Sequence, residues 1–220
     1  MLTRNQCYFK RIFDLVISLL LLIPLFPLIL IGWTIASIET KKNGFFLQSR
    51  IGRFGKKFKI IKLRTMRDSS CVTNHITVHN DPRITRFGRI FRKLKIDEFP
   101  QLLNVIIGQM SLVGPRPDVE GFADLLIGEY RSILHVRPGI TGPASIYFRN
   151  EEELLSSVKC PAEFNREFLW PKKIYINFEY INKYKFTNDL IYLYQTLTNK
   201  GHTFAVHDLD IKYIKSNNEG

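Results

Sequence analysis

An uncharged, apolar segment near the N-terminus constrains this chain more than any other feature. Residues 15–38 contain no charged side chain and are bounded by Asp14 and Glu39. Because an α-helix rises about 1.5 Å per residue, a helix of this length crosses a hydrocarbon core of roughly 30 Å. The segment is longer than the core of a signal peptide, and no small-residue cleavage site follows it. The sequence therefore predicts a membrane element that is retained.

Two prolines interrupt this segment near its middle. Pro24 and Pro27 each remove a helical hydrogen bond and crowd the preceding turn, so we expect a sharp bend there. Positive residues favour the cytoplasmic side of a membrane, and both flanks of the segment are positive. We therefore predict a re-entrant membrane helix-hairpin over residues 1–40, which enters and leaves through the cytoplasmic leaflet. A simple membrane span and the buried helix of a soluble protein are the alternatives.

Positive charge is concentrated in the part of the chain that follows. The net charge is +12, and residues 41–95 contain sixteen Lys or Arg against two Asp. Such a block favours polyanions, namely nucleic acid, phosphorylated small molecules or anionic lipid headgroups. The three cysteines are widely scattered and lack metal-ligand spacing, which is typical of a reducing cytosolic environment.

The pattern after residue 40 predicts a compact cytoplasmic domain of the α+β class, mostly helical. The β-prone runs 45–49 and 58–63 flank a turn and predict a small β-hairpin. Residues 85–95 have apolar side chains at helical spacing and basic side chains on the other faces. Such an amphipathic helix lies either in the plane of the lipid headgroups or against its own domain. Two more helices are expected over 97–107 and 118–134.

Composition sets the remaining boundaries. Residues 67–82 are polar and are expected to form a loop, in which His75 and His79 lack further ligands for a metal. Residues 41–201 contain no repeat or long linker, so we expect one compact domain there. Residues 202–220 are polar and are expected to form a tail.

An adjacent pair of carboxylates, Asp97 and Glu98, closes the basic stretch. At a helix N-terminus two such neighbours can reach one ion, and Mg²⁺ commonly takes one or two carboxylates together with phosphate oxygens. An ordinary helix cap is the alternative. Asp is a favoured N-cap residue, Glu stabilises the first turn, and Pro100 is tolerated in that turn. The spacing of the pair is compatible with either role.

Five basic residues are candidates for binding an anionic substrate beside the pair. Arg116 lies between two prolines, which fix its backbone and lower the entropic cost of aiming its guanidinium at a phosphate. Arg92 is on the predicted amphipathic helix just before the pair. Lys62 and Arg64 alternate on the second predicted strand, and Arg137 lies in an Arg-Pro-Gly turn. Lys62, Arg64 and Arg92 could instead be solvated surface residues, and Arg116 and Arg137 could instead belong to plain structural turns.

Six short motifs follow one another along the chain. They are 10–14 (KRIFD), 58–66 (FKIIKLRTM), 81–88 (DPRITRFG), 96–105 (IDEFPQLLNV), 110–117 (MSLVGPRP) and 136–142 (VRPGITG). In this order and spacing they resemble the bacterial sugar transferase family, the small monotopic polyprenyl-phosphate phosphoglycosyl transferases. The resemblance runs from about Phe9 to Thr198. Each motif alone is a weak signal, whereas the ordered set is specific.

The resemblance implies a reaction and a set of residue roles. A phosphosugar is expected to move from a UDP-sugar to polyprenyl (undecaprenyl) phosphate, with release of UMP, as the first step of bacterial surface glycan synthesis. Asp97 is implied as the nucleophile of a covalent phosphosugar-aspartyl intermediate, and Glu98 beside it as a Mg²⁺ ligand or proton-handling group. Arg92 and Arg116 are implied to bind phosphates or the nucleotide. The expected location is the cytoplasmic face of the bacterial inner membrane, among membrane lipids.

Two other classes of protein are alternatives. One is a membrane-tethered protein that binds nucleic acid or anionic lipid without catalysis. Prolines and carboxylates interrupt the basic residues here, so nucleic acid is not expected as a partner. The other is a direct glycosyl transferase, which would release UDP instead of UMP. Residues 143–145 (PAS) replace a Trp-Ala-Gln common in the family, and residues 149–170 look individual. The resemblance therefore leaves the sugar open.

Overall fold

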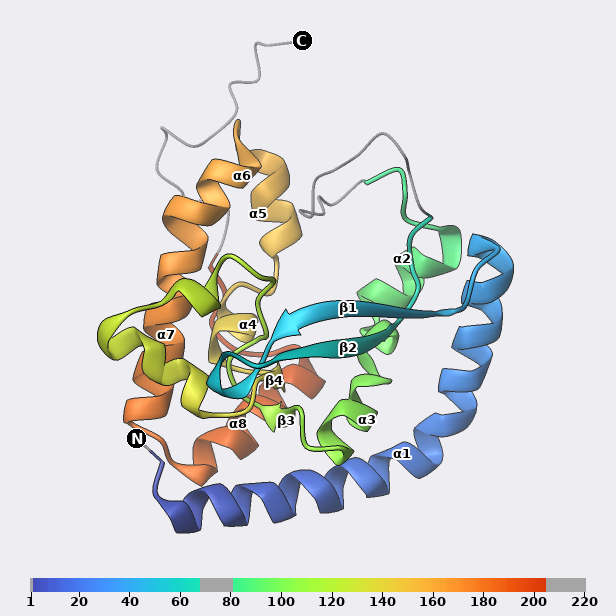
Figure 1. The fold of residues 1–220 in the computed structure, drawn as a ribbon. Helices are drawn as coiled ribbons and strands as arrows, with labels where there is room; N and C mark the ends of the chain where they lie inside the picture. Colours follow the sequence, from blue (N-terminus) through green and yellow to red (C-terminus); the bar gives the residue numbers. More distant parts are fainter. Residues whose placement is uncertain (1, 68–80, 205–220) are drawn as a thin grey trace.

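The computed structural model describes residues 2–67 and 81–204, which form a mostly helical α+β fold (Figure 1). This confirms the predicted fold class at the coarse level. The helices are α1 (Arg4–Thr40), α2 (Arg86–Lys93), α3 (Gln101–Ile106), α4 (Pro143–Tyr147), α5 (Glu151–Ser157), α6 (Pro161–Phe164), α7 (Trp170–Asn182) and α8 (Phe186–Thr198). The strands are β1 (Phe45–Ile51), β2 (Lys57–Leu63), β3 (Ser111–Val113) and β4 (Gly139–Thr141).

Helix α1 runs unbroken through both prolines. Thr3 caps its first turn, because the Thr3 hydroxyl accepts from the Gln6 N–H (3.3 Å) and the Gln6 side chain accepts from the Thr3 N–H (2.8 Å). Lys41 ends the helix in the left-handed conformation. The helix changes direction partway along (Figure 1), and Pro24 and Pro27 lie in its interior. The structure thus has one bent, continuous helix, and its hairpin topology in a membrane stays a prediction.

Apolar side chains cover much of the surface of α1. Ile23 is 75% exposed and Ile38 is 72% exposed. The other large exposed apolar side chains on this helix are Tyr8, Phe9, Ile12, Val16, Leu19, Leu20, Leu21, Phe26, Leu28, Leu30 and Ile31. Soluble proteins rarely leave so large an apolar surface in water. Within the described ranges, α1 is long and apolar enough to cross a membrane. These observations disfavour the helix of a soluble core and indicate membrane association.

Three polar residues from the first turns of α1 attach the helix to the rest of the domain. The Lys10 Nζ lies 2.6 Å from the Oδ2 of Asp189 on α8, and both side chains are buried. Arg11 donates to the last two carbonyls of α3, at 2.7 and 3.0 Å. The Asp14 carboxylate accepts from the Leu112 N–H on β3 (3.1 Å). The motif at 10–14 therefore docks the apolar helix onto three separate elements.

Strands β1 and β2 form the predicted antiparallel hairpin, with Phe45 opposite Leu63 and Ile51 opposite Lys57. The edge of β2 that faces away from β1 is bound by one buried side chain of α3. The Asn104 Oδ1 accepts from the Ile61 N–H (3.0 Å), and its Nδ2 donates to the Lys59 carbonyl (2.8 Å). An amide side chain thus replaces a neighbouring strand and fixes the hairpin against α3.

The short strands β3 and β4 pair in parallel, which the sequence did not predict. Ser111 is opposite Gly139, and Val113 is opposite Thr141. The two backbones nearly touch where β4 begins and β3 has just ended, because a Cβ on Gly139 would lie 2.1 Å from the backbone nitrogen of Gly114. Only glycine allows this approach. The glycines of the motifs at 110–117 and 136–142 therefore lock the two motifs together.

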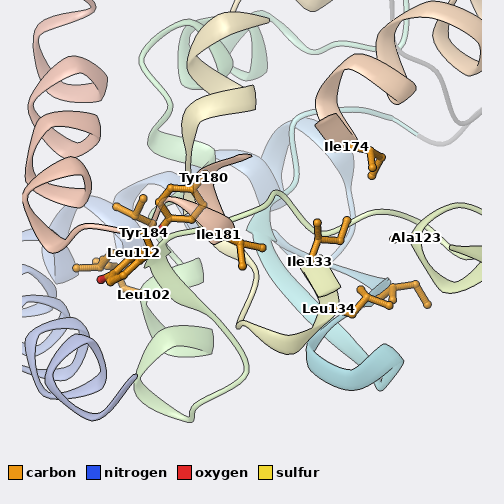
Figure 2. Close-up of a cluster of buried hydrophobic side chains, with 11 residues drawn as sticks. Leu102, Leu112, Ala123, Ile133, Leu134, Ile174, Tyr180, Ile181 and Tyr184 are labelled. Carbon is orange, nitrogen blue, oxygen red and sulfur yellow. The ribbon is translucent and has the colours of Figure 1, made fainter. Parts of the chain in front are cut away.

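The main hydrophobic core lies where α3, β3, α7 and the segment between β3 and β4 meet, and most of its members are drawn in Figure 2. Leu112 and Tyr180 are among them, and a second cluster packs around Phe148, Leu154 and Phe164. The buried members of the main core are Ile51, Leu102, Leu112, Val113, Ala123, Ile133, Leu134, Ile174, Tyr180, Ile181 and Tyr184.

Two predicted helices differ from what is observed. The segment 118–134 contains only the 3₁₀ turns Ala123–Leu125 and Gly128–His135, with no α-helix. Gly121 and Gly128 adopt positive φ (89° and 62°), which breaks the helical path. The helix expected over 97–107 is split into a 3₁₀ turn, Ile96–Glu98, and the shorter α3. The loop 67–82, with His75 and His79, and the tail 202–220 lie largely outside the described residues.

We expect Asn104→Ala to lower the free energy of unfolding by roughly 2–4 kcal/mol, because it leaves a backbone donor and an acceptor of β2 without partners. Urea unfolding of the detergent-solubilised protein, followed by tryptophan fluorescence, measures this loss. The exposed Asn182→Ala on α7 is the matched control and should change stability by less than about 0.5 kcal/mol. Equal effects of the two substitutions would contradict the role of Asn104.

Candidate active site

The acidic pair lies in a 3₁₀ turn, Ile96–Glu98, between α2 and α3. Lys95, just before it, has φ 58°, a left-handed conformation that costs a non-glycine residue on the order of 1 kcal/mol. Neither side chain of the pair caps a helix: the residue that precedes α3 is Pro100, and no side-chain cap bond is present at either turn. Both carboxylates are instead buried. The helix-cap interpretation is therefore wrong.

The carboxylate of Glu98 is held by two cations from distant segments. Its Oε1 lies 2.6 Å from the Arg116 Nη2 and 3.2 Å from the Lys62 Nζ, and the Glu98 side chain is 11% exposed. Burial alone would raise the pKa of Glu98, but Arg116 and Lys62 together hold it well below its ordinary value. Glu98 is therefore a fixed anion that positions two cations.

Asp97 is in the opposite situation. It is buried, and its Oδ1 has no hydrogen-bond partner in the described part of the chain. Burial raises the pKa of Asp97 above its ordinary value, and the neighbouring Glu98 adds to this effect. A buried carboxylate oxygen without a partner is destabilised until a metal ion or an electrophile meets it.

Arg116 is aimed by a rigid loop. The loop leaves β3 at Gly114 and is joined to the end of β1, where the Ile51 N–H donates to the Asp118 carbonyl (2.9 Å). Arg50 of β1 also donates to the Pro117 carbonyl (3.2 Å). Burial lowers the pKa of Arg50 to about 10, and the nearby Arg116 contributes to this shift. The loop that carries the predicted proline-fixed arginine is thus held between the end of β3 and the end of β1.

The other predicted substrate-binding residues divide into two groups. Arg92 of α2 pairs with Glu152 of α5, and its charge acts to lower the pKa of Asp97. Arg64 instead donates to the Asn43 carbonyl (2.9 Å) at the base of the hairpin. Arg137 donates to the Gly108 carbonyl (2.8 Å) beyond the end of α3. The structure therefore brings Lys62, Arg92 and Arg116 around the pair, and gives Arg64 and Arg137 contacts with the backbone elsewhere.

Several residues near the site were missed by sequence reasoning. Burial raises the pKa of Asp118, whose Oδ2 accepts from the Trp170 Nε1 at 3.2 Å. Lys173 of α7 pairs with Glu151 of α5 at 2.5 Å. Asp118 follows the GPRP motif directly and could have been suspected on that ground. The others come from a region where the sequence shows no shared motif.

The pair is suited to a magnesium ion that is shared with a substrate. In the described residues, no group of three or more His, Cys, Asp or Glu forms a metal cage. Mg²⁺ typically binds through one or two carboxylates and takes its other ligands from phosphates and water. The Oδ1 of Asp97, which has no hydrogen-bond partner among the described residues, would supply an oxygen ligand of this kind beside Glu98.

Comparison with known proteins identifies the class. The family of bacterial sugar transferases matches residues 5–202, so the chain belongs to this family. The resemblance inferred from the six motifs is thereby confirmed, and so is the expected transferase class.

Particular relatives have related names. The chain is 40% identical over 145 residues to the exopolysaccharide production protein PSS of Rhizobium leguminosarum, covering 62% of this chain and 72% of that protein. It is 35% identical over 181 residues to an uncharacterized sugar transferase, EpsL, of Bacillus subtilis, covering 82% and 81%. It is 42% identical over 143 residues to a UDP-glucose:undecaprenyl-phosphate glucose-1-phosphate transferase of Caulobacter vibrioides, covering 62% and 53%. The chain thus spans about half of the last relative.

We expect opposite stability changes when the two carboxylates are neutralised. Asp97→Asn should stabilise the fold by roughly 1 kcal/mol at neutral pH, because it removes a desolvated charge without a partner. Glu98→Gln should destabilise it by about 3–5 kcal/mol, because Lys62 and Arg116 lose their shared counter-charge. Urea unfolding at several pH values measures both effects.

The pH dependence follows from the two pKa directions. The pKa of Asp97 in the folded protein is raised above 3.8. Ionisation of Asp97 therefore lowers the free energy of unfolding as pH rises from 3.8 through the folded pKa. Below pH 3.8 the carboxyl is protonated in both states, and the stability advantage of Asn disappears. The folded pKa of Glu98 is below 4.5, so its stabilisation is present above pH 4.5 and is lost as pH falls through the folded pKa. A destabilising Asp97→Asn at neutral pH would refute the assignment of an unpaired carboxylate.

Proposed function

We propose that this chain transfers a phosphosugar from a UDP-sugar to polyprenyl (undecaprenyl) phosphate and releases UMP. The observation that carries the proposal is the buried Asp97, whose Oδ1 lacks a hydrogen-bond partner in residues 2–67 and 81–204, beside a Glu98 that pairs with two cations. Relatives named as UDP-glucose and UDP-N-acetylgalactosamine transferases to undecaprenyl phosphate support the substrate classes. Others named for exopolysaccharide production support a role in surface glycan synthesis.

In the first step of the proposed reaction, the Asp97 carboxylate oxygen attacks the phosphorus that carries the sugar. A phosphorus–oxygen bond forms to Asp97, the bond to the uridine phosphate breaks, and UMP leaves with the electron pair. In the second step, an oxygen of polyprenyl phosphate attacks the same phosphorus, and the Asp97 carboxylate is regenerated. Splitting one transfer into two displacements is the advantage of a covalent nucleophile.

The surrounding residues have roles that follow from their charges. Lys62 and Arg116, which are oriented by Glu98, neutralise phosphate oxygens as negative charge shifts to the leaving group. Arg92 binds a phosphate of the donor. A magnesium ion held by Asp97 and Glu98 would supply charge neutralisation of the diphosphate. The burial of the pair excludes water, which would otherwise hydrolyse the aspartyl phosphate.

We also propose a location for the enzyme. Helix α1 would enter the bilayer and return at its bend, so that both ends lie at the cytoplasmic face of the bacterial inner membrane. The exposed apolar side chains of α1 and the cations on both sides of it support this arrangement. The lipid phosphate acceptor would then lie at the same face as Asp97.

We expect Asp97→Asn to abolish UMP release from a UDP-sugar in the presence of polyprenyl phosphate and Mg²⁺, a loss of at least about 10³-fold, because an amide cannot form the acyl phosphate. A coupled assay for UMP, run over a panel of UDP-sugars that includes UDP-glucose, measures this and identifies the donor. Glu163→Gln on α6 is the control, because Glu163 is an exposed carboxylate outside the site.

Four results would contradict the proposal, or one part of it, in different ways. Turnover of Asp97→Asn at the normal rate would remove Asp97 as the nucleophile. Release of UDP in place of UMP would identify a direct glycosyl transferase. Salt-sensitive binding of nucleic acid or anionic lipid that survives Asp97→Asn, together with no turnover of any UDP-sugar, would indicate a binding protein. Undiminished turnover after chelation of Mg²⁺ would remove the metal from the mechanism.

To test the topology, one cysteine is placed before α1 and another after it. We expect both to react from the cytoplasmic side only. One cysteine is added ahead of Met1 and another replaces the exposed Lys56 in the β1–β2 turn, with the native cysteines changed to serine. Labelling of intact cells with a membrane-impermeant maleimide, compared with inverted vesicles, measures the side. Labelling of one end from outside would indicate a simple membrane span.

A further inference from the structure

The first turn of α5 carries three consecutive glutamates, and two of them pair with cations beside the candidate active site. Glu152 pairs with Arg92, whose side chain is 22% exposed. The Glu151 Oε1 lies 2.5 Å from the Nζ of Lys173, on α7. Glu153, the third, is exposed, and no ion pair of its side chain occurs in the described part of the chain. Two of the three glutamates therefore neutralise cations of the protein.

Both pairs are electrostatically connected to the reacting groups. Burial raises the pKa of Asp97, and Arg92 is among the cations that oppose this rise. Glu98 is the main cause of the raised pKa of Arg116, and Glu151 adds to it. Arg92 is therefore within electrostatic reach of the nucleophile, and Glu151, the partner of Lys173, is within electrostatic reach of the proline-fixed arginine.

Buried leucines fix the backbone of α5, whereas the Glu151 and Glu152 side chains are 33% and 43% exposed. Leu154 is fully buried and Leu155 is 4% exposed, and both pack in the cluster around Phe148 and Phe164. Displacing the two carboxylates therefore requires only rotation of side chains on a helix that stays in place. A partly exposed ion pair is a weak interaction. The oxygens of a diphosphate carry more charge and compete well for the same cations.

We propose that Glu151 and Glu152 are placeholders for donor phosphates, which occupy Lys173 and Arg92 until a nucleoside diphosphate group displaces them. Lys173 is thereby assigned as a further donor-binding residue. The identity of the donor rests on the proposed function. After the transfer, the single phosphate of UMP competes less well than the diphosphate did, and renewed pairing of the glutamates with the two cations favours its release.

The experiment measures binding of UDP, a stable diphosphate without the sugar, to the full-length protein in detergent with Mg²⁺ by isothermal titration calorimetry. Glu151→Gln and Glu152→Gln should each lower the Kd of UDP about three- to fivefold, because a competing carboxylate is removed. Glu153→Gln, the matched control, should change it less than about twofold. Lys173→Gln should raise the Kd about tenfold. The control for this variant is Lys172→Gln, which should leave the Kd unchanged. The Lys172 Nζ lies 3.9 Å from the ring centroid of Phe168.

Other results would overturn the proposal. Equal tightening by Glu153→Gln would mean that only the overall charge matters. Weaker UDP binding by Glu151→Gln or Glu152→Gln would mean that these carboxylates help to hold the donor. Each of the two glutamates tests the proposal alone, so a folding defect in one variant leaves the other informative. If the protein releases no UMP from any UDP-sugar while the binding pattern holds, the proposed function fails and the placeholder role stands. If UMP is released and the variants bind UDP as the wild type does, only the placeholder role fails.

Discussion

The two ion pairs of Glu98 join three distant parts of the chain at one carboxylate. Lys62 comes from β2, Arg116 from the loop after β3, and Glu98 itself from the turn before α3. Such a buried group is costly alone and favourable only when both partners are in place, so it specifies one arrangement of the three segments. Asn104 on α3 also joins distant segments, but through neutral hydrogen bonds that fix β2 against α3. The geometry around Asp97 depends on both.

The site is maintained at some cost to stability. Lys95 adopts a left-handed backbone conformation immediately before the pair, and the buried Asp97 has an oxygen without a hydrogen-bond partner in the part of the chain that the structure describes. Unfavourable local features of this kind persist only where the surrounding structure determines them, and they cluster at functional sites. Here the compensation comes from Glu98 and from the locked backbones at Gly114 and Gly139.

The parts of the fold that were predictable are those with a periodic or repeated signal. The hairpin of β1 and β2 follows from two β-prone runs around a turn, the helix α2 from apolar side chains at helical spacing, and α1 from a long uncharged apolar run. The parallel pair β3–β4 was not predictable, because strands of three residues carry no alternation that a sequence can reveal. The segment 118–134 was misread as helical because its apolar spacing is helix-like, while two glycines with positive φ force 3₁₀ turns.

The site was predictable in its residue types and only partly in its partners. Asp97, Glu98, Lys62, Arg92 and Arg116 were all named from sequence, and the structure places them together. Tertiary packing decides which carboxylate faces Arg116. Glu98 therefore forms the ion pairs, and the Oδ1 of Asp97 is left without a hydrogen-bond partner among the described residues. Arg64 and Arg137 show the reverse: their position in motifs singles them out, whereas each donates to a backbone carbonyl away from the pair.

The docking of α1 through Lys10, Arg11 and Asp14 has a consequence for how the enzyme would meet its lipid acceptor. A helix held by three elements of the domain is a rigid mount, so the depth at which it rests in the bilayer sets the height of Asp97 above the lipid headgroups. Under the proposed function, acceptor and enzyme then diffuse in the same plane and collide at a constant elevation. The search for the lipid is reduced to two dimensions. The distance from the headgroup plane to Asp97, which the lipid phosphate must span, is then set by the protein.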